Sequence, residues 1–382
     1  MHIAFNGWFW DQPNTGSGQY IRRLLHNLRR VAPDLQMTLI LPPHNTAPDD
    51  LPTDVSIVST RKTLLGGQLG KVWFEQRTYP AMVGRVGADI AHVPYWGPPL
   101  SSPARLITSV LDVIPLAIPD YARGFKARLY TSLVTAAARG SSHTITLSQD
   151  SKADIVKYIG LPAETITPIY LAADEAYHPR IGAERDAAVR EKYNLPDEFV
   201  LGIGGFDVRK QFNQLLLAYT YVGQAEGDNI PLVMAGREPE WGTGVFPDLP
   251  KYAAELNVAD YVRWIGYVDE ADKPSLYRLA RVFVFPSVYE GFGLPVLEAM
   301  ASGVPVVAND VSSIPEIVAD GAYLVEPGDA RAMAGAIIAL LLQPSLHESL
   351  VTQGLARATH FSWRKTAKET LAVYEKVMGM PE

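Results

Sequence analysis

Short apolar segments alternate with longer amphipathic segments along the whole chain. Most of the apolar segments are continuous, which is typical of strands buried on both faces of a parallel sheet. We expect strands at residues 2–5, 37–41, 90–93, 106–110, 144–147, 199–203, 232–235, 282–285, 304–308 and 323–325. Strand–helix alternation of this kind predicts a doubly wound α/β architecture.

Two of the amphipathic segments have clear helical spacing. In residues 17–30 the apolar positions that share one face are Ile21, Leu24, Leu25 and Leu28. In residues 362–378 the apolar members are Trp363, Leu371, Tyr374 and Val377. Side chains three or four positions apart share one face of a helix, so each pattern predicts a helix with one buried side.

A polar, charge-rich stretch at residues 178–192 separates two runs of strand and helix patterns. A fresh strand pattern begins at Phe199. We therefore predict an N-terminal domain at residues 1–175, a second domain at 176–361 and a final helical segment at 362–382. Both domains have an ordinary size.

Composition excludes several classes of protein. The 382 residues are 47% hydrophobic with a net charge of −7, which argues against disorder and against nucleic-acid binding. There is no cysteine, so disulfides, thiolate metal sites and cysteine nucleophiles are excluded. No apolar run reaches the roughly 18–20 residues of a membrane span. The first residues form a strand pattern rather than a signal peptide, so we expect a cytoplasmic protein.

One loop has the features of a phosphate site. Gly204 and Gly205 follow the predicted strand at 199–203, and Arg209 and Lys210 precede a helix that starts near Gln211. A glycine-rich turn, a helix N-terminus and two cations together favour a diphosphate ligand. Two solvated surface charges are the alternative.

The loop that follows the strand at 282–285 carries the strongest signal. Glu290 is followed by Gly291 and Gly293, and Pro295 fits the first turn of a helix that contains Glu298. The amides of residues 291–294 are expected to point toward an anion. The two carboxylates could hold sugar hydroxyls, because ionised carboxylates only accept hydrogen bonds.

Other positions leave two interpretations open. Gly16 and Gly18 form either a tight turn or a close approach to a ligand. Asn309 either reaches a ligand or stabilises a turn, and His92 is either functional or a strand-end residue. The aromatic run at 8–10 either stacks on an acceptor or packs at the interface between the domains.

A basic and apolar stretch at residues 121–130 also has two interpretations. Its cations are Arg123, Lys126 and Arg128, and its apolar neighbours are Phe125, Leu129 and Tyr130. Such a segment can contact an anionic membrane surface, or it can be the solvated face of a helix.

Taken with its surroundings, the loop at 286–298 resembles the retaining glycosyltransferases of family 4. Glu290 and Glu298 match that family's Glu-x7-Glu pair, and Arg209-Lys210 matches its basic phosphate-binding pair. Residues 264–268 resemble the family's strand and loop that lie next to the bound nucleotide. The first half matches more loosely, through Gly16-x-Gly18, residues 91–94 and residues 146–148.

The resemblance implies a GT-B fold: two Rossmann-like domains that face a central cleft, with a C-terminal helix crossing back to the first domain. It implies a UDP- or GDP-sugar donor, no metal or other cofactor, and a glycan or lipid-linked acceptor on the N-terminal domain. The implied donor-binding residues are Gly16, Gly18, Gly205, Arg209, Lys210, Tyr267, Glu290, Gly291, Phe292, Gly293, Leu294 and Glu298.

The resemblance also implies individual roles. Glu298 would hold the ribose and Glu290 the transferred sugar, while Arg209 and Lys210 would neutralise the diphosphate as it leaves. Related sequences often have His-Asp where this chain has Leu111-Asp112. We therefore count Asp112 among the candidate catalytic residues. The alternatives are a non-catalytic nucleotide-sugar-binding member, a nucleotide-sugar epimerase and an oxidoreductase.

Overall fold

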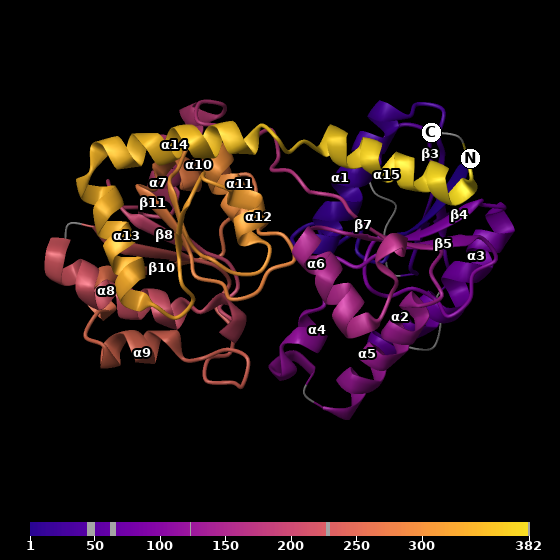
Figure 1. The fold of residues 1–382 in the computed structure, drawn as a ribbon, viewed down its shortest axis with the longest axis horizontal. Coiled ribbons are helices and arrows are strands. Elements are labelled where there is room, and N and C mark those ends of the chain that lie inside the picture. The colour runs from indigo at the N-terminus through magenta and orange to yellow at the C-terminus, as the bar shows by residue number, and fades with distance from the viewer. Residues whose placement is uncertain (44–49, 62–65, 123, 227–229, 381–382) are drawn as a thin grey trace. The chain divides into compact units, whose positions relative to one another are not determined.

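The computed structural model describes residues 1–43, 50–61, 66–122, 124–226 and 230–380. The chain divides into two compact units. The first comprises Met1–Leu171 with Ser362–Glu382, and the second comprises Ala172–Phe361. Each unit is built on its own parallel sheet with helices packed against it (Figure 1). The final helical segment therefore belongs to the N-terminal unit.

The sheet of the first unit has the order β3-β2-β1-β4-β5-β6-β7, and its neighbouring strands are parallel. Its strands are β1 (His2–Asn6), β2 (Gln36–Leu41), β3 (Val55–Ser59), β4 (Ile90–Val93), β5 (Arg105–Ser109), β6 (His143–Thr146) and β7 (Ile166–Pro168). The pattern of continuous apolar runs predicted five of these strands. It missed β3 and β7, which lie at the two edges of the sheet.

Helices cover both faces of this first sheet. They are α1 (Gly16–Val31), α2 (Gly67–Trp73), α3 (Tyr79–Val86), α4 (Ile114–Ala117), α5 (Phe125–Ala138), α6 (Gln149–Asp154) and α15 (Trp363–Met378). The predicted apolar face of α1 is buried. Helix α1 begins where the Thr15 hydroxyl accepts a hydrogen bond from the Gly18 amide, and α15 begins in the same way at Ser362. The two helices pack against each other.

His92 on β4 anchors α15 within the first unit. Its imidazole lies 2.6 Å from the Tyr374 hydroxyl on α15 and 2.9 Å from the Ser109 hydroxyl on β5. Burial lowers the pKa of His92 to about 3, so the ring is neutral. The structure therefore favours the interpretation of His92 as a structural residue of its strand. His143 is also buried and bonds to Thr167 at 2.8 Å.

The sheet of the second unit has the order β10-β9-β8-β11-β12-β13, and its neighbouring strands are also parallel. Its strands are β8 (Val200–Ile203), β9 (Leu232–Ala235), β10 (Val262–Gly266), β11 (Val282–Phe285), β12 (Val306–Asn309) and β13 (Tyr323–Val325). Its helices are α7 (Asp186–Lys192), α8 (Phe212–Glu226), α9 (Leu249–Glu255), α10 (Lys273–Leu279), α11 (Leu294–Ala301), α12 (Ile314–Val318), α13 (Ala330–Leu342) and α14 (Pro344–Ala358).

The strand order reverses once in each sheet. In the first sheet the reversal lies between β1 and β4, and in the second it lies between β8 and β11. Ligands of open α/β sheets bind outside the carboxyl ends of the strands at such a reversal. The loops that follow β8 and β11 are the two that the sequence singled out.

In the part of the chain that the structure describes, no single helix is long and apolar enough to cross a membrane. One bent pair of segments, Ala330–Leu342 with Pro344–Met378, reaches the length and apolar composition of a membrane span only when the two are taken together.

Candidate functional site

The loops after β8 and β11 meet at the carboxyl edge of the second sheet. The Val288 amide donates a hydrogen bond to the Arg209 carbonyl at 3.0 Å, which joins the two loops directly. Phe206 anchors the first loop in the core, where its ring packs against Phe212 and Trp264, each at 5.4 Å between ring centres. The packing of Phe206 therefore fixes the loop that carries Arg209 and Lys210.

Three charged side chains converge within this edge. Arg209 Nη1 lies 2.5 Å from Glu290 Oε1, and Lys210 Nζ lies 2.7 Å from the same oxygen. Arg209 Nη1 also donates to the Tyr289 carbonyl at 2.8 Å. Lys210 lies 4.5 Å from the centre of the Phe285 ring. The sequence placed these three residues in one site, but it did not predict that the two cations would pair with Glu290.

The pairing determines the charge of the cluster. Burial alone would raise the pKa of Glu290, but the Lys210 and Arg209 cations hold the pKa below its ordinary value. Burial lowers the pKa of Lys210, and the Glu290 carboxylate opposes that change. Glu290 is therefore an ionised carboxylate at neutral pH, able to accept hydrogen bonds from hydroxyl groups.

The loop after β12 fixes the backbone of Glu290. The Ser312 hydroxyl donates to the Glu290 carbonyl at 2.8 Å, and the Ser313 hydroxyl donates to the same carbonyl at 2.9 Å. The Glu290 amide in turn donates to Ser312 Oγ at 3.2 Å. From the sequence, only Asn309 was considered at this loop, and the role of the two serines was missed.

Asn309 has a structural role. It is buried, and its side-chain amide donates to the carbonyls of Pro286 and Ser287 at 2.6 and 3.2 Å. Asn309 therefore fixes the end of β11, which agrees with the turn interpretation. No contact to a ligand is needed to explain its position.

Gly293 allows the sharp turn into α11. Its φ of 101° lies in the left-handed region, and a Cβ atom there would lie 2.6 Å from the Ile314 Cδ1 atom. Both facts require glycine at this position. At the start of α11, Pro295 has no N–H, and the Val296 and Leu297 amides donate to the Gly293 carbonyl at 3.0 and 3.3 Å. The Phe292 side chain is buried against Phe361.

Glu298 lies on α11, in its own buried environment. Tyr277 donates its hydroxyl proton to Glu298 Oε2 at 3.0 Å, and Tyr177 is a further hydrogen-bond partner. Burial raises the pKa of Glu298 to about 7. The two glutamates of the Glu-x7-Glu pair thus differ: Glu290 is ionised, while Glu298 titrates near neutral pH.

The other predicted residues of this unit follow β8, β10 and β11. Gly205 is exposed after β8, and Tyr267 is exposed after β10, with the Arg237 guanidinium 5.7 Å from its ring centre. Gly291 lies between Glu290 and the turn at Gly293. All of them lie in loops at the carboxyl edge of the second sheet.

The predicted residues of the first unit have structural contacts. Gly18 is buried, and a Cβ atom there would lie 2.0 Å from the Gln12 carbonyl oxygen, so the position requires glycine for packing. Its amide already donates to Thr15. Gly16 is the first residue of α1, and a Cβ atom at this position would have no other atom within 4 Å. Asp112 accepts a hydrogen bond from the Ile114 amide at 3.1 Å, as in an Asx turn.

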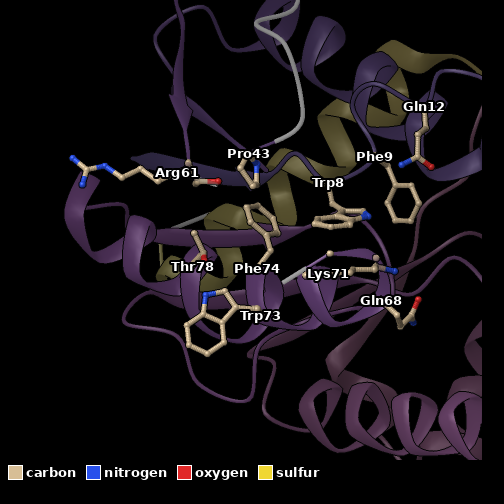
Figure 2. A pocket seen from close by; sticks show the side chains of 14 residues that line it. Trp8, Phe9, Gln12, Pro43, Arg61, Gln68, Lys71, Trp73, Phe74 and Thr78 are labelled. Atoms are coloured by element: carbon tan, nitrogen blue, oxygen red, sulfur yellow. The ribbon is translucent and has the colours of Figure 1, made fainter. Parts of the chain in front are cut away.

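A cavity of about 730 Å³ opens at the carboxyl edge of the first sheet (Figure 2). Trp8 and Phe9 line it after β1, Pro43 after β2 and Thr60 after β3, and α2 contributes Trp73 among others. Trp10 does not take part, because it is buried and covered by the Arg22 guanidinium at 5.0 Å. Within the aromatic run, Trp8 and Phe9 therefore line a cavity, whereas Trp10 packs in the interior of the first unit.

A buried charged pair adjoins this cavity. The Lys71 ammonium lies about 5 Å from the ring centres of Phe9, Tyr95 and Tyr130, and 3.7 Å from Glu75. Burial lowers the pKa of Lys71 and raises the pKa of Glu75 to about 7. Lys71 therefore presents a cation to a cavity that is also lined by the aromatic side chains of Trp8, Phe9, Trp73 and Phe74.

Comparison with known proteins agrees with this geometry. The sequence model of the family "Glycosyl transferases group 1" matches residues 185–357, and that of "Glycosyltransferase Family 4" matches residues 14–177. The O-antigen chain mannosyltransferase B of Escherichia coli is 34% identical over 285 residues, which are 74% of each chain. The chain belongs to the group 1 glycosyltransferases.

This glycosyltransferase has further relatives of similar kind. The MMP α-(1→4)-mannosyltransferase of Mycolicibacterium hassiacum is 32% identical over 63% of this chain and 56% of its own length. Sucrose-phosphate synthase of Thermosynechococcus elongatus superposes with a TM-score of 0.77 at 22% identity, over 99% of both chains. Anabaena HepE, solved with UDP and glucose, has a TM-score of 0.72 at 18% identity, over 98% of this chain and 99% of its own. The fold is that of the GT-B glycosyltransferases.

Proposed function

We propose that this glycosyltransferase transfers a hexose from a UDP- or GDP-sugar to a hydroxyl of a glycan or glycolipid, with retention of anomeric configuration and without a metal ion. The observation that carries the proposal is the convergence of Arg209, Lys210 and Glu290 at the strand reversal of the second sheet. A cation pair and a carboxylate at one point match a ligand that has both a diphosphate and a sugar.

Arg209 and Lys210 are assigned to the diphosphate. Negative charge grows on the leaving phosphate as the glycosidic bond breaks, so fixed cations stabilise the transition state more than the bound donor. Phe206 packs in the core beneath the loop that carries them, and the Phe285 ring lies 4.5 Å from the Lys210 ammonium. These cations would take the place of a metal. Among the described residues, no group of three His, Asp or Glu side chains gathers to hold a metal ion.

Glu290 is assigned to the transferred sugar. Its partners keep it ionised, so it can accept hydrogen bonds from sugar hydroxyls, and Ser312 and Ser313 hold its backbone in place. We assign Glu298 to the ribose. Retention would follow if the acceptor hydroxyl attacks from the face that the phosphate leaves, with the phosphate oxygen taking the proton.

The acceptor is assigned to the cavity of the first unit. Its aromatic side chains offer flat apolar surfaces on which sugar rings stack, and Gln12, Gln68 and Lys71 offer hydrogen bonds to hydroxyls. We propose mannose as the hexose, because the curated relatives compared above are named as mannosyltransferases.

The test is an assay with UDP- and GDP-hexoses, GDP-mannose included, and a panel of glycan acceptors in the presence of EDTA. We expect transfer from one nucleotide family, unaffected by EDTA, and a product whose new linkage has the anomeric configuration of the donor by NMR. Donor binding without any turnover would indicate the non-catalytic alternative. An inverted linkage or loss of activity in EDTA would contradict the corresponding part of the proposal.

A further inference from the structure

One arginine ties the end of α14 to the end of α12. Arg357 Nε donates a hydrogen bond to the Ile317 carbonyl at 2.8 Å, and Arg357 Nη2 donates to the Glu316 carbonyl at 2.7 Å. These carbonyls belong to the last turn of α12, where a helix leaves its carbonyl groups without partners of its own. Because a planar guanidinium can hold two such carbonyls at once, Arg357 fixes the end of α12.

The turn after α12 packs directly on α14. Ala319 in this turn has a φ of 50°, in the left-handed region that alanine rarely adopts. A Cβ atom on Gly321 would lie 3.0 Å from the Gly354 Cα atom, so two glycines bring the backbones of the turn and of α14 together. A strained turn persists only where the surrounding structure holds it. Arg357, one helical turn after Gly354, is part of that support.

The other end of α12 contacts the loop that carries Glu290. Ser313, which precedes α12, has its hydroxyl oxygen 2.9 Å from both the Glu290 and the Phe292 carbonyl oxygens. Ile314 is the first residue of α12, and its Cδ1 atom lies where a Cβ atom on Gly293 would be. A displacement of α12 would therefore move the backbone of residues 290–293, which we call the donor loop.

Phe361, the last residue of the second unit, supports the donor loop at Phe292. The two rings meet edge to face, with 6.0 Å between their centres and an angle of 82° between their planes. Phe361 is only 8% exposed and Phe292 only 4%. The Arg357 guanidinium lies 5.0 Å from the centre of the Phe361 ring. The residue that fixes α12 therefore also contacts the ring that supports Phe292.

We propose that Arg357 and Phe361 are positioning residues for the donor loop. Arg357 acts through α12 and Ser313, and Phe361 acts through Phe292, so that together they hold Glu290 in place for the transferred sugar. A displacement of about 1 Å at a reacting group can lower a rate about 100-fold. The effect on transfer rests on the proposed function of Glu290, whereas the support of the donor loop does not.

Amide hydrogen exchange of the full chain tests the support of the donor loop. Phe361→Leu and Arg357→Gln should each speed exchange in residues 290–293 at least about tenfold, because the loop opens more often when its support is removed. Leu350→Val is the matched control. Leu350 is buried in the core of the second unit on the same helix, about two turns before Arg357, so this variant loses packing without losing either support. Its donor loop should exchange like that of the wild type.

Kinetics test the consequence for transfer. In Phe361→Leu and Arg357→Gln, kcat should fall at least about tenfold, while affinity for free UDP or GDP by calorimetry stays within about twofold, because Arg209 and Lys210 lie on another loop. Phe361→Tyr keeps the ring and should restore both kcat and slow exchange.

The proposal is overturned by unchanged loop exchange in Phe361→Leu, by an unchanged kcat in both variants, or by equal losses in Leu350→Val. If the wild type transfers no sugar, the proposed function fails, and hydrogen exchange still decides whether Arg357 and Phe361 hold the donor loop.

Discussion

Lys210 Nζ lies 2.7 Å from Glu290 Oε1, and this contact joins the two chemical elements of the site. The cation that we assign to the donor's diphosphate neutralises the carboxylate that we assign to its sugar. Before the donor binds, each of these buried charges has the other as its partner. An unpaired charge in a buried place would destabilise the fold. When the diphosphate arrives, it competes with Glu290 for the cations.

This competition leads to a prediction for Glu290. Glu290→Gln should lower the rate of transfer at least about 100-fold, because an ionised acceptor of sugar hydroxyls is lost. Affinity for the free nucleoside diphosphate should stay equal or rise, because Arg209 and Lys210 lose a competing anion. Calorimetric titration and a transfer assay measure the two effects separately. A variant that transfers sugar at nearly the wild-type rate would remove Glu290 from the mechanism.

Glu298 should make donor binding depend on pH. Its pKa of about 7 means that the carboxylate ionises as the pH rises through neutrality, and only the ionised form accepts hydrogen bonds from both ribose hydroxyls. Affinity for a nucleotide-sugar, whose diphosphate diester does not titrate in this range, should be about tenfold tighter at pH 8 than at pH 6. Glu298→Gln should flatten the profile, and Glu326→Gln, an exposed control, should not.

His92 should make the first unit sensitive to acid. The buried ring has a pKa of about 3 in the folded state against an ordinary value of 6.5, so below pH 6.5 the unfolded chain binds a proton that the folded chain does not. The contribution of this group to the free energy of unfolding is fully present above pH 6.5. It falls as the pH drops and is smaller by about 2 kcal/mol at pH 5. The stability difference between wild type and His92→Asn should narrow by that amount between pH 7 and pH 5. A constant difference in urea unfolding would show that the ring is not kept neutral.

Gly293→Ala should destabilise the second unit by about 2 kcal/mol, because alanine is strained at positive φ and its Cβ would collide with Ile314. Adding Ile314→Val removes the colliding methyl group but not the strain, so a double-mutant cycle should show partial recovery. Gly335→Ala, in open space on α13, should instead stabilise by up to about 1 kcal/mol. Equal effects of both alanines would contradict the assigned geometry.

The sequence predicted those parts of the fold that depend on local pattern. Continuous apolar runs identified the buried strands, and helical spacing identified α1 with its buried face. It also identified α15 as a helix, but of its predicted apolar members only Tyr374 is buried, and the rest of the buried face is made by Thr366, Ala367, Thr370 and Val373. Strand β3 was missed because Val55–Ser59 is interrupted by serines and stays largely exposed at the sheet edge. Strand β7 was missed because it is three residues long and ends in Pro168.

The candidate site was predictable as a set of residues but not as a set of contacts. Glycines, a helix N-terminus and charged residues marked the two loops after β8 and β11. The support of Glu290 by Ser312 and Ser313 comes from a third loop, and serine near a turn is common enough to carry no signal alone. Burial raises the pKa of Glu298, and the hydroxyls of Tyr277 and Tyr177, which are distant from it in sequence, oppose that rise.

The most direct test of the account is calorimetric titration of UDP and GDP, with EDTA present, into wild type and Lys210→Gln. Removing one charged hydrogen bond to the diphosphate should weaken binding of the preferred nucleotide at least about tenfold. Lys251→Gln, an exposed lysine of the same unit, should bind like the wild type. If Lys210→Gln binds both nucleotides as tightly as the wild type while remaining folded, the diphosphate does not lie at this cluster and the central claim is wrong.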